Sequence, residues 1–263
     1  MLKRWARRLV AGGSRLAGIG RGGRLRPGLR ILTYHRVAED RQDPFAVSRS
    51  DFIRQMETVS QTGAVQPLEE AIEGMSREGD TGPRIALTFD DGTEDFLSCA
   101  LPVIRRLGLP ATLYVSPLRV GERGFLNWEE LSAVCRMGVR IGSHGWDHQS
   151  LGRLNPDDVW QQVTRSRDVL QDRLGLKVSS LAYPYGTVRD FNDHVKELIR
   201  RAGYLSACTS VNGVNRKATD PYELLRTKIE QGDGPSFQGI LCGGLDAWAL
   251  IDRNLTLIQN RYA

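Results

Sequence analysis

Two adjacent carboxylates at the end of an apolar run could bind a metal or transfer a proton. The run 85–89 is followed directly by Asp90, Asp91 and Gly92. Neighbouring side chains on a strand point to opposite faces, so the two carboxylates cannot both decorate one exposed face. The alternative interpretation is an Asp-Gly turn after an ordinary strand, because Asp-Gly is a common turn signal. Residues elsewhere in the chain must decide between a turn and a reactive site.

Two of the four histidines lie in one hexapeptide, Ser143-His144-Gly145-Trp146-Asp147-His148. The i, i+4 spacing can aim two imidazoles at one point, in a helical turn or in a compact loop. A pair of surface or capping histidines is the alternative. Two histidines and one aspartate make a metal-ligand set with open coordination positions for a water and a substrate carbonyl. One carboxylate of the aspartate pair then binds the metal, and the other takes a proton from the metal-held water.

The elements that must position these residues alternate between strand and helix. Apolar runs predict strands at 31–34, 85–89, 111–115, 139–143, 179–183, 204–209 and 224–229. Helices are expected from a cap at Ser50 or Asp51, at 67–72, 95–107, 128–137, 155–174 and 191–201, and from about 245 onward. This alternation favours a parallel sheet, and seven or so strands in one domain favour a closed β/α barrel.

The candidate residues share one position in this predicted barrel. Each follows a predicted strand directly: His35, Asp90, Asp91, His144 and Tyr185. In β/α barrels the chemistry gathers at the carboxyl ends of the strands. An Fe(II) oxygenase with the same ligand set is disfavoured, because those enzymes are mostly jelly-roll β folds.

Composition and charge indicate one soluble domain with a basic leader. The 263 residues are 40% hydrophobic and 25% charged, and no apolar run approaches the ~18 residues of a membrane span. The net charge is +5, but residues 1–30 hold nine basic residues and no acid, which leaves 27 basic against 31 acidic residues in the rest. We therefore expect no nucleic-acid partner. Four widely spaced cysteines without a CxxC pair indicate reduced thiols.

Residues 1–29 are assigned to the leader and residues 30–263 to the barrel domain. The apolar run 9–11 is broken at once by glycines, so the leader lacks the ~7–15 continuous apolar residues of a secretory signal. With Trp5, Leu9, Leu16 and Ile19 among its arginines, the leader either rests on anionic lipid or is a disordered tail. We expect a cytoplasmic protein, membrane-peripheral in the first case.

The paired motifs resemble those of a known family. Thr88-Phe89-Asp90-Asp91-Gly92 followed by His144-x-x-x-His148 resembles the first two motifs of the polysaccharide deacetylases, the NodB-homology group of carbohydrate esterases. Tyr183-Pro184-Tyr185-Gly186 resembles the third motif, which shapes one wall of the groove. Residues 31–37 are similar to the start of a bacterial subgroup that acts in exopolysaccharide synthesis. The resemblance covers roughly residues 30–230 and implies a distorted (β/α) barrel.

The resemblance also implies residue roles and a reaction. Asp91, His144 and His148 would hold one divalent metal, zinc by family habit, although the ligand set also admits cobalt, nickel or manganese. Asp90 would be the base that activates the metal-held water. The implied reaction removes an acetyl group, most readily from nitrogen, on a sugar, polysaccharide or lipid-linked saccharide. The alternatives are a deformylase or deacylase of a lipid-linked sugar, and a catalytically weakened sugar-binding homologue.

Three positions depart from the family pattern. The third motif usually begins with an arginine that steadies the base, and here that position is Ala182. Arg226, after a late strand, is a candidate for this cation, with a surface arginine as the alternative. Gly145 stands where the second motif usually has Ser or Thr. The fifth motif, which supplies a histidine as general acid, is missing because no histidine follows His194.

An amine leaving group needs a proton, so another acid is required. By elimination it is His35 or His194, and we favour His35 because it ends a strand on the same barrel face as Asp90. Tyr185 and Trp146 are candidates for stacking on a sugar ring, with Pro184 beside them and core packing as the alternative. A backbone N–H, that of Tyr185, is a candidate oxyanion donor.

Overall fold

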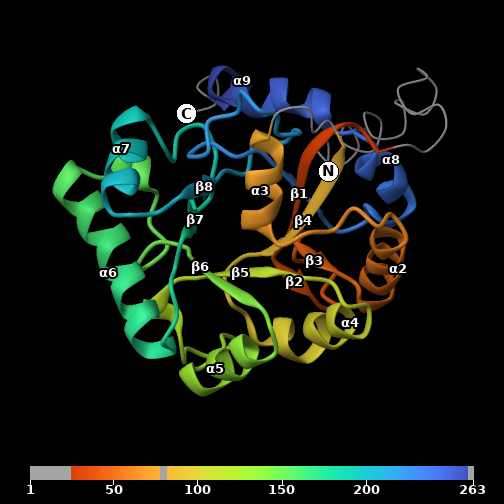
Figure 1. Ribbon diagram of the computed structural model, residues 1–263, viewed down its shortest axis with the longest axis horizontal. Helices are drawn as coiled ribbons and strands as arrows, with labels where there is room; N and C mark the ends of the chain where they lie inside the picture. The colour runs from red at the N-terminus through yellow and green to blue at the C-terminus, as the bar shows by residue number, and fades with distance from the viewer. Residues whose placement is uncertain (1–24, 78–81, 260–263) are drawn as a thin grey trace.

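The chain folds around one parallel sheet. The computed structural model describes residues 25–77 and 82–259 (Figure 1). Seven strands pair in the order β8-β7-β6-β5-β4-β1-β9, and each of these pairings is parallel. The strands are β1 (Gly28–Tyr34), β4 (Pro83–Phe89), β5 (Thr112–Val115), β6 (Arg140–Ser143), β7 (Ser180–Ala182), β8 (Ser206–Cys208) and β9 (Arg226–Lys228). Each coincides with one predicted strand, so the predicted seven-stranded α/β barrel is confirmed.

The barrel closes between its two outermost strands, but only over a short stretch. Cys208 of β8 forms an isolated parallel bridge with Leu224, which lies two residues before β9. The Leu224 N–H donates to the Ala207 carbonyl at 2.9 Å, and the Thr209 N–H donates to the Leu224 carbonyl at 2.8 Å. A single bridge, in place of a full ladder, therefore connects the two edges of the sheet.

The helices of the described residues are α2 (Arg49–Ser60), α3 (Leu68–Ser76), α4 (Leu101–Arg106), α5 (Trp128–Arg136), α6 (Pro156–Leu174), α7 (Asp193–Arg201), α8 (Phe237–Leu241) and α9 (Ala249–Gln259). Most of them surround the barrel on its outside (Figure 1). Helix α3 instead covers the amino-terminal end of the barrel, where Leu68, Ala71 and Met75 pack into a cluster with Leu29 of β1. This cluster leaves the carboxyl end as the end available for a site.

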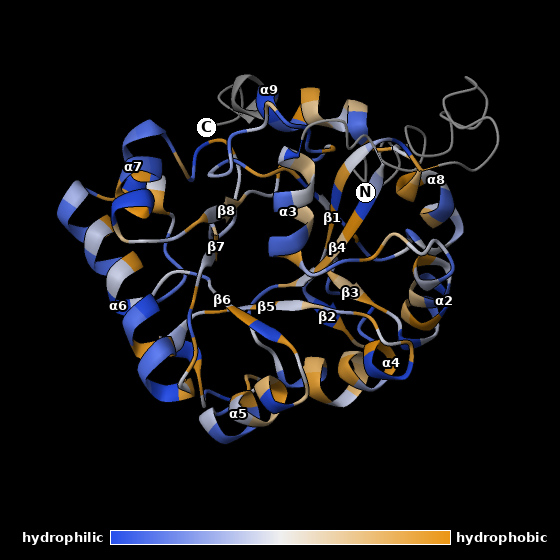
Figure 2. Cartoon of the chain, viewed as in Figure 1, coloured by the Kyte–Doolittle hydropathy of each residue, from blue (hydrophilic) through white to orange (hydrophobic). Residues whose placement is uncertain are grey.

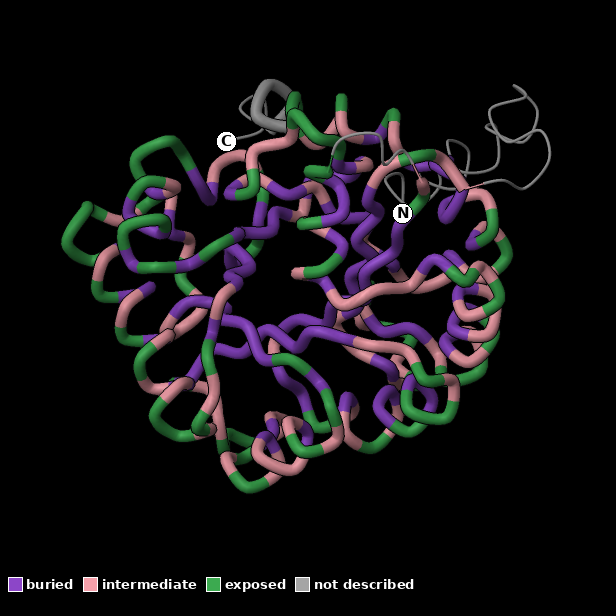
Figure 3. The backbone as a smooth tube through the Cα atoms, in the orientation of Figure 1, coloured by how far each residue is buried: buried purple, intermediate pink, exposed green. Residues whose placement is uncertain are grey.

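Strand periodicity explains which side chains reach the barrel interior. Leu87 and Phe89 of β4 belong to the large apolar cluster between sheet and helices, whereas Ala86 belongs to the small cluster inside the barrel. Because side chains alternate along a strand, Thr88 and then Asp90 continue the inward series. Burial follows this arrangement, with the strands buried and the outer helix surfaces exposed (Figure 3). Helix α6 has apolar residues among those that it buries and mostly hydrophilic residues elsewhere (Figure 2).

Helix α6 begins and ends where the sequence predicts. Asn155 caps its first turn by accepting from the Asp158 N–H, Pro156 is its first residue, and Gly175 ends it in the left-handed conformation at φ 65°. Trp128, the first residue of α5, packs against the main core.

Other helix boundaries differ from the prediction. The cap of α2 is Ser48, whose hydroxyl accepts from the Asp51 N–H, so the predicted cap at Ser50 or Asp51 is wrong. The expected helix 95–107 begins as a π-helix, η1 (Phe96–Ala100), before α4. Pro102 lacks an N–H to donate to that first turn. The final helix begins at Ala249, after α8 and the 3-10 turn η5 (Asp246–Trp248).

Residues 1–24 of the predicted leader lie outside the described residues. Strand β1 begins at Gly28, inside the range assigned to the leader. All four cysteines are free thiols. In the part of the chain that the structure describes, the helices lack the combination of length and apolar character that a membrane crossing requires.

Candidate active site

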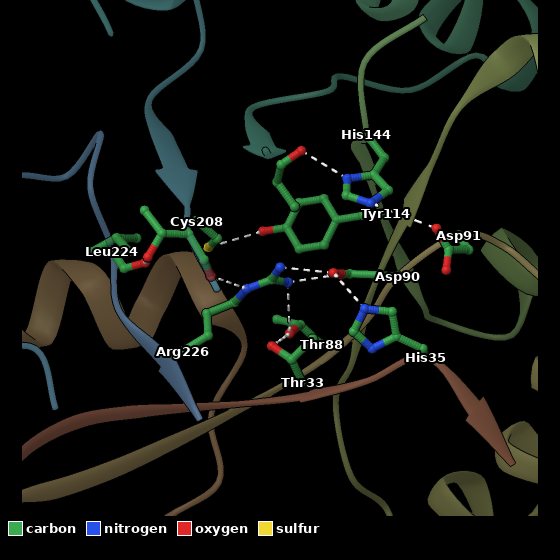
Figure 4. A network of polar contacts seen from close by, with 12 residues as sticks. Thr33, His35, Thr88, Asp90, Asp91, Tyr114, His144, Cys208, Leu224 and Arg226 are labelled. Carbon is green, nitrogen blue, oxygen red and sulfur yellow. Dashed lines mark hydrogen bonds and ion pairs between the residues drawn. The ribbon is translucent and has the colours of Figure 1, made fainter. Parts of the chain in front are cut away.

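The carboxyl end of the barrel brings together five of the predicted site residues: His35, Asp90, Asp91, His144 and Arg226 (Figure 4). Asp90 follows β4 and extends its pairing, because its N–H donates to the Tyr34 carbonyl at 2.9 Å. Its side chain is 2% exposed and lies between Arg226 of β9 and His35, which follows β1. Four parts of the chain that are far apart in sequence therefore meet around one buried carboxylate: the residues that follow β1, β4 and β6, and the first residue of β9.

Arg226 binds both oxygens of Asp90. Its two terminal nitrogens donate to Asp90 Oδ1 and Oδ2, each at 2.7 Å, and its Nε donates to the Thr209 carbonyl at 2.7 Å. The side chain is fully buried, so the alternative of a surface arginine is wrong. Ala182, where the family keeps its arginine, is also buried inside the barrel. The cation beside Asp90 therefore comes from β9 in this chain.

Nearby positive charge affects the pKa of Asp90 more than its burial does. Burial alone would raise the pKa of this carboxyl, but the Arg226 guanidinium, with His144 and His35 nearby, holds the pKa below its usual value. Asp90 is therefore ionised at neutral pH.

Asp91, His144 and His148 bring three potential ligand atoms together. Asp91 Oδ1 lies 3.4 Å from His148 Nε2 and 3.7 Å from His144 Nε2, and all three atoms lie within 4.8 Å of one another. Two ligands at about 2.0–2.1 Å from a tetrahedral metal are separated by about 3.3 Å, so these spacings are close to those of a metal site.

The hydrogen bonding of these residues supports the same interpretation. Asp91 Oδ1 is buried and accepts no hydrogen bond of normal geometry within the described residues. The His144 Nδ1 lies 2.8 Å from the Ala182 carbonyl; donation along this contact leaves the Nε2 lone pair directed at Asp91. Burial lowers the pKa of His144 to about 4, which keeps the ring neutral, as a metal ligand must be. The three residues fit a divalent metal.

Backbone conformation at the site is strained in three places. Within the described residues, the non-glycine residues with positive φ are Asp91 (74°), His148 (67°) and Tyr185 (61°). A left-handed backbone is unfavourable for residues with a Cβ and is found preferentially at functional sites. Gly145, at φ 73°, adopts the same conformation, which gives a backbone reason for glycine where the family has Ser or Thr.

His35 lies at the edge of the same site. Its Nε2 is 3.8 Å from Asp90 Oδ2, and its ring stacks on Phe45 at a centroid distance of 5.0 Å. Its Nδ1 is buried without a hydrogen-bond partner among the described residues. Burial lowers the pKa of His35, while Asp90 and Asp91 oppose the shift. The other candidate acid, His194, is exposed in the first turn of α7.

The predicted sugar-binding residues differ in accessibility. Tyr185 is 60% exposed, and its ring lies 4.8 Å from that of His148. Pro184 is buried against Gly145. Trp146 is half-buried, with the Arg165 guanidinium 3.8 Å above its ring. Tyr185 and His148 line a cleft of about 560 Å³.

Two residues at the site were not predicted from the sequence. Gln162 of α6 accepts from the Trp146 N–H at 2.8 Å and donates to Asp147, which fixes the loop between the two histidines. Gln162 is a polar residue among the buried residues of α6, most of which are apolar, and this was the available signal. Phe45 stacks on His35 from the loop between the two-residue strands β2 (Arg36–Val37) and β3 (Ala46–Val47), and no sequence signal marks it.

Comparison with known proteins agrees with the motifs. Residues 77–207 match the family model described as polysaccharide deacetylase, and this range contains the aspartate pair and both candidate histidine ligands. The chain belongs to the polysaccharide deacetylase family. This family of hydrolases was the one predicted from the motifs, and that prediction is confirmed.

Relatives of this deacetylase family resemble different shares of the chain. A putative polysaccharide deacetylase, YxkH, of Bacillus subtilis is 23% identical over 206 residues, which cover 78% of this chain and 72% of that protein. The peptidoglycan-N-acetylglucosamine deacetylase PgdA of Listeria monocytogenes is 32% identical over 109 residues, 41% of this chain and 22% of that protein. The solved structure of the Streptococcus pyogenes deacetylase PplD, 22% identical, has a TM-score of 0.75 over 82% of this chain and 99% of that one, which shows the shared fold.

Proposed function

We propose that this protein is a metal-dependent hydrolase that removes acetyl groups, most readily from nitrogen, from a sugar or polysaccharide. The observation that carries the proposal is the Asp91, His144 and His148 cluster directly beside the buried Asp90–Arg226 pair. The relatives described as deacetylases support the same reaction class. The similarity of residues 31–37 to the exopolysaccharide-synthesis subgroup favours a bacterial exopolysaccharide among the candidate substrates.

Asp91, His144 and His148 would hold the metal, with zinc, cobalt, nickel and manganese all compatible with this ligand set. When bound, a divalent metal polarises a carbonyl and lowers the pKa of water. Asp90 is the base that takes a proton from the attacking water, and its lowered pKa keeps it ready to do so. Arg226 holds both carboxylate oxygens, which limits their rotation and fixes the direction of proton transfer.

His35 is the proposed acid that protonates the departing amine. The distance of 3.8 Å between His35 Nε2 and Asp90 Oδ2 supports this role, whereas exposed His194 makes no such contact with Asp90 among the described residues. The Tyr185 N–H is the proposed backbone donor to the developing oxyanion. Tyr185, Pro184 and Trp146 are proposed to contact the sugar, with exposed Tyr185 the most accessible of the three.

Acetate release from acetylated chito-oligosaccharides tests the proposal. We expect turnover with zinc, loss of turnover with a chelator, and a decrease of about 10²–10⁴-fold in the Asp90→Asn variant, the usual contribution of a general base. Zinc content should be unchanged in this variant. Asp193→Asn, which alters a fully exposed aspartate on α7, is the matched control and should keep wild-type activity.

Two outcomes would change this assignment. Full activity in Asp90→Asn would remove the base from Asp90. Bound zinc without turnover on any acetylated sugar would favour the sugar-binding homologue, and release of formate in place of acetate would favour a deformylase. The buried Asp90–Arg226 pair disfavours the weakened homologue, because Arg226 supplies beside Asp90 the cation that is absent at Ala182. Location in the cytoplasm and lipid contact through residues 1–29 stay predictions.

A further inference from the structure

A cleft beside the candidate metal ligands carries three arginines. It has a volume of about 560 Å³, and its lining includes His148, Tyr185, Arg119, Arg153 and Arg189. We call it the arginine cleft. Because His148 belongs to the metal cluster, a substrate whose acetyl group lies at the metal extends into this cleft.

Each of these arginines comes from a different loop at the carboxyl end of the barrel. Arg119 ends the 3-10 turn η2 (Pro117–Arg119) after β5, and Arg153 ends the turn η3 (Leu151–Arg153) after β6. Arg189 lies in the loop between β7 and α7. Three consecutive loops of the barrel thus direct one cation each to the same cleft, which is the arrangement of a binding surface at this end of the fold.

The two aspartates in the cleft are occupied by internal donors. Asp190 is buried and accepts from the Ser150 hydroxyl and from the N–H and hydroxyl of Thr187. Asp147 accepts from the side-chain amides of Gln149 and Gln162. Their carboxylate oxygens hold the loops together, and among the described residues neither carboxylate forms an ion pair with Arg119 or Arg153. The lining carries three arginines against these two carboxylates.

Two of the arginines remain available to a ligand. Within the described part of the chain, neither Arg119 nor Arg153 forms an ion pair; Arg119 lies over the Phe125 ring at 5.2 Å, and Arg153 is exposed. Guanidinium groups bind phosphate and carboxylate through paired hydrogen bonds. A neutral sugar would not need three cations in a cleft that also contains His148.

We propose that the arginine cleft binds an oxyanion, a phosphate or a carboxylate, carried by the substrate next to the acetylated sugar. The substrate is then an anionic acetylated saccharide and not a neutral polymer. This inference rests on the proposed function, because it assumes that the acetyl group lies at the metal cluster. It adds a substrate class that the metal and base residues alone do not specify.

Binding to the metal-free protein separates the cleft from the metal, which would itself bind an anion. The probes are methyl N-acetylglucosaminide (neutral), N-acetylglucosamine 1-phosphate (phosphate) and N-acetylmuramic acid (carboxylate). After treatment with a chelator and its removal, titration calorimetry at low salt should show about tenfold or tighter binding of at least one anionic probe relative to the neutral one. Added salt should reduce the difference. The tighter anionic probe identifies the oxyanion.

Paired variants assign this preference to the cleft. Arg119→Gln with Arg153→Gln should abolish the anionic preference, and Arg153→Gln alone, at an exposed position, should weaken it. Arg54→Gln with Arg106→Gln removes the same charge from exposed positions on α2 and α4 and should leave the preference unchanged. Equal binding of neutral and anionic probes to wild type, or a full preference in the cleft variant, would overturn the inference.

Turnover separates this inference from the proposed function. With zinc restored, the cleft variant should raise KM for the preferred anionic probe about tenfold and leave kcat unchanged. A wild-type protein that deacetylates its substrate but shows no preference for either anionic probe would overturn the cleft alone. Anion binding that depends on Arg119 and Arg153, in a protein that deacetylates nothing, would overturn the proposed function and leave an anionic-sugar site.

Discussion

Asp90 and Asp91 are neighbours in sequence with different surroundings. Strand alternation turns Asp90 into the barrel, where Arg226 holds it, and the left-handed backbone at Asp91 and Gly92, φ 74° and 72°, turns the next carboxylate toward the histidines. The Asp-Gly turn and the reactive pair were alternative interpretations of the sequence, and the turn proves to be what separates the two carboxylates. One peptide unit thus divides the proposed base from a proposed metal ligand.

A contact between two site residues was easier to predict when the residues lie close together in the sequence. His144 and His148 could be paired because they lie four residues apart, and each has a chemistry that restricts its partners. Arg226 could be named only as one option, because its partner Asp90 lies 136 residues away and no local pattern links them. Phe45 could not be identified at all, since an aromatic residue in a loop carries no signal of the ring on which it stacks.

His35 provides the first test at this scale. His35→Ala should lower deacetylation about 10²-fold or more, because an amine leaves slowly without an acid to protonate it. His194→Ala is the matched control, and its turnover should equal wild type because the residue is exposed on α7. Acetate release measured across pH for both variants checks the assignment. A large effect of His194→Ala and none of His35→Ala would reverse the two roles.

At the scale of elements, the strands were easier to predict than the helix ends. Seven apolar runs bounded by breakers correspond to the seven strands, since buried parallel strands need continuous apolar sequence. The cap of α2 was misplaced because Ser48, Ser50 and Asp51 all have capping side chains, and only the backbone conformation selects Ser48. Strands β2 and β3 have two residues each, too few for any periodicity to show.

Gly142 of β6 provides a test of barrel packing. A Cβ at this position would lie 2.4 Å from two ring carbons of Tyr114, which is buried inside the barrel. Gly142→Ala should therefore lower the free energy of unfolding by about 1–3 kcal/mol, as overpacking does. Denaturant unfolding checks the value. Combining it with Tyr114→Leu should restore part of the loss. Simple additivity of the two single variants would show that the ring is not the obstacle.

At the scale of the whole molecule, the barrel interior changes character from one end to the other. Helix α3 closes the amino-terminal end over Leu29, Ile31 and other apolar side chains of the strands. The interior positions nearer the carboxyl end carry threonine, aspartate, histidine and arginine. Folding therefore buries ionisable groups of the site, and the stability of the whole chain depends on their protonation.

The metal-free protein should lose stability on acidification. Burial lowers the pKa of His144 to about 4 from 6.5, so the unfolded chain binds a proton in this range that the folded chain does not. The stabilisation is complete above pH 6.5 and is lost as pH falls toward 4, by up to about 3 kcal/mol at 1.4 kcal/mol per unit. His35, also lowered mainly by burial, acts in the same direction. Below pH 3.8, protonation of Asp90 adds a further loss, because its pKa is also lowered.

Urea unfolding with a chelator at pH 7, 6, 5 and 4.5 measures the slope of the free energy of unfolding against pH. His144→Gln should flatten it, because glutamine takes up no proton on unfolding, whereas His194→Gln, at an exposed position, should leave it as in wild type. Identical slopes in wild type and His144→Gln would mean that His144 is not buried as a neutral ring in the metal-free protein. The lone pair assigned to its Nε2 would then have to be protonated, and the metal ligand set would lose one of its three members.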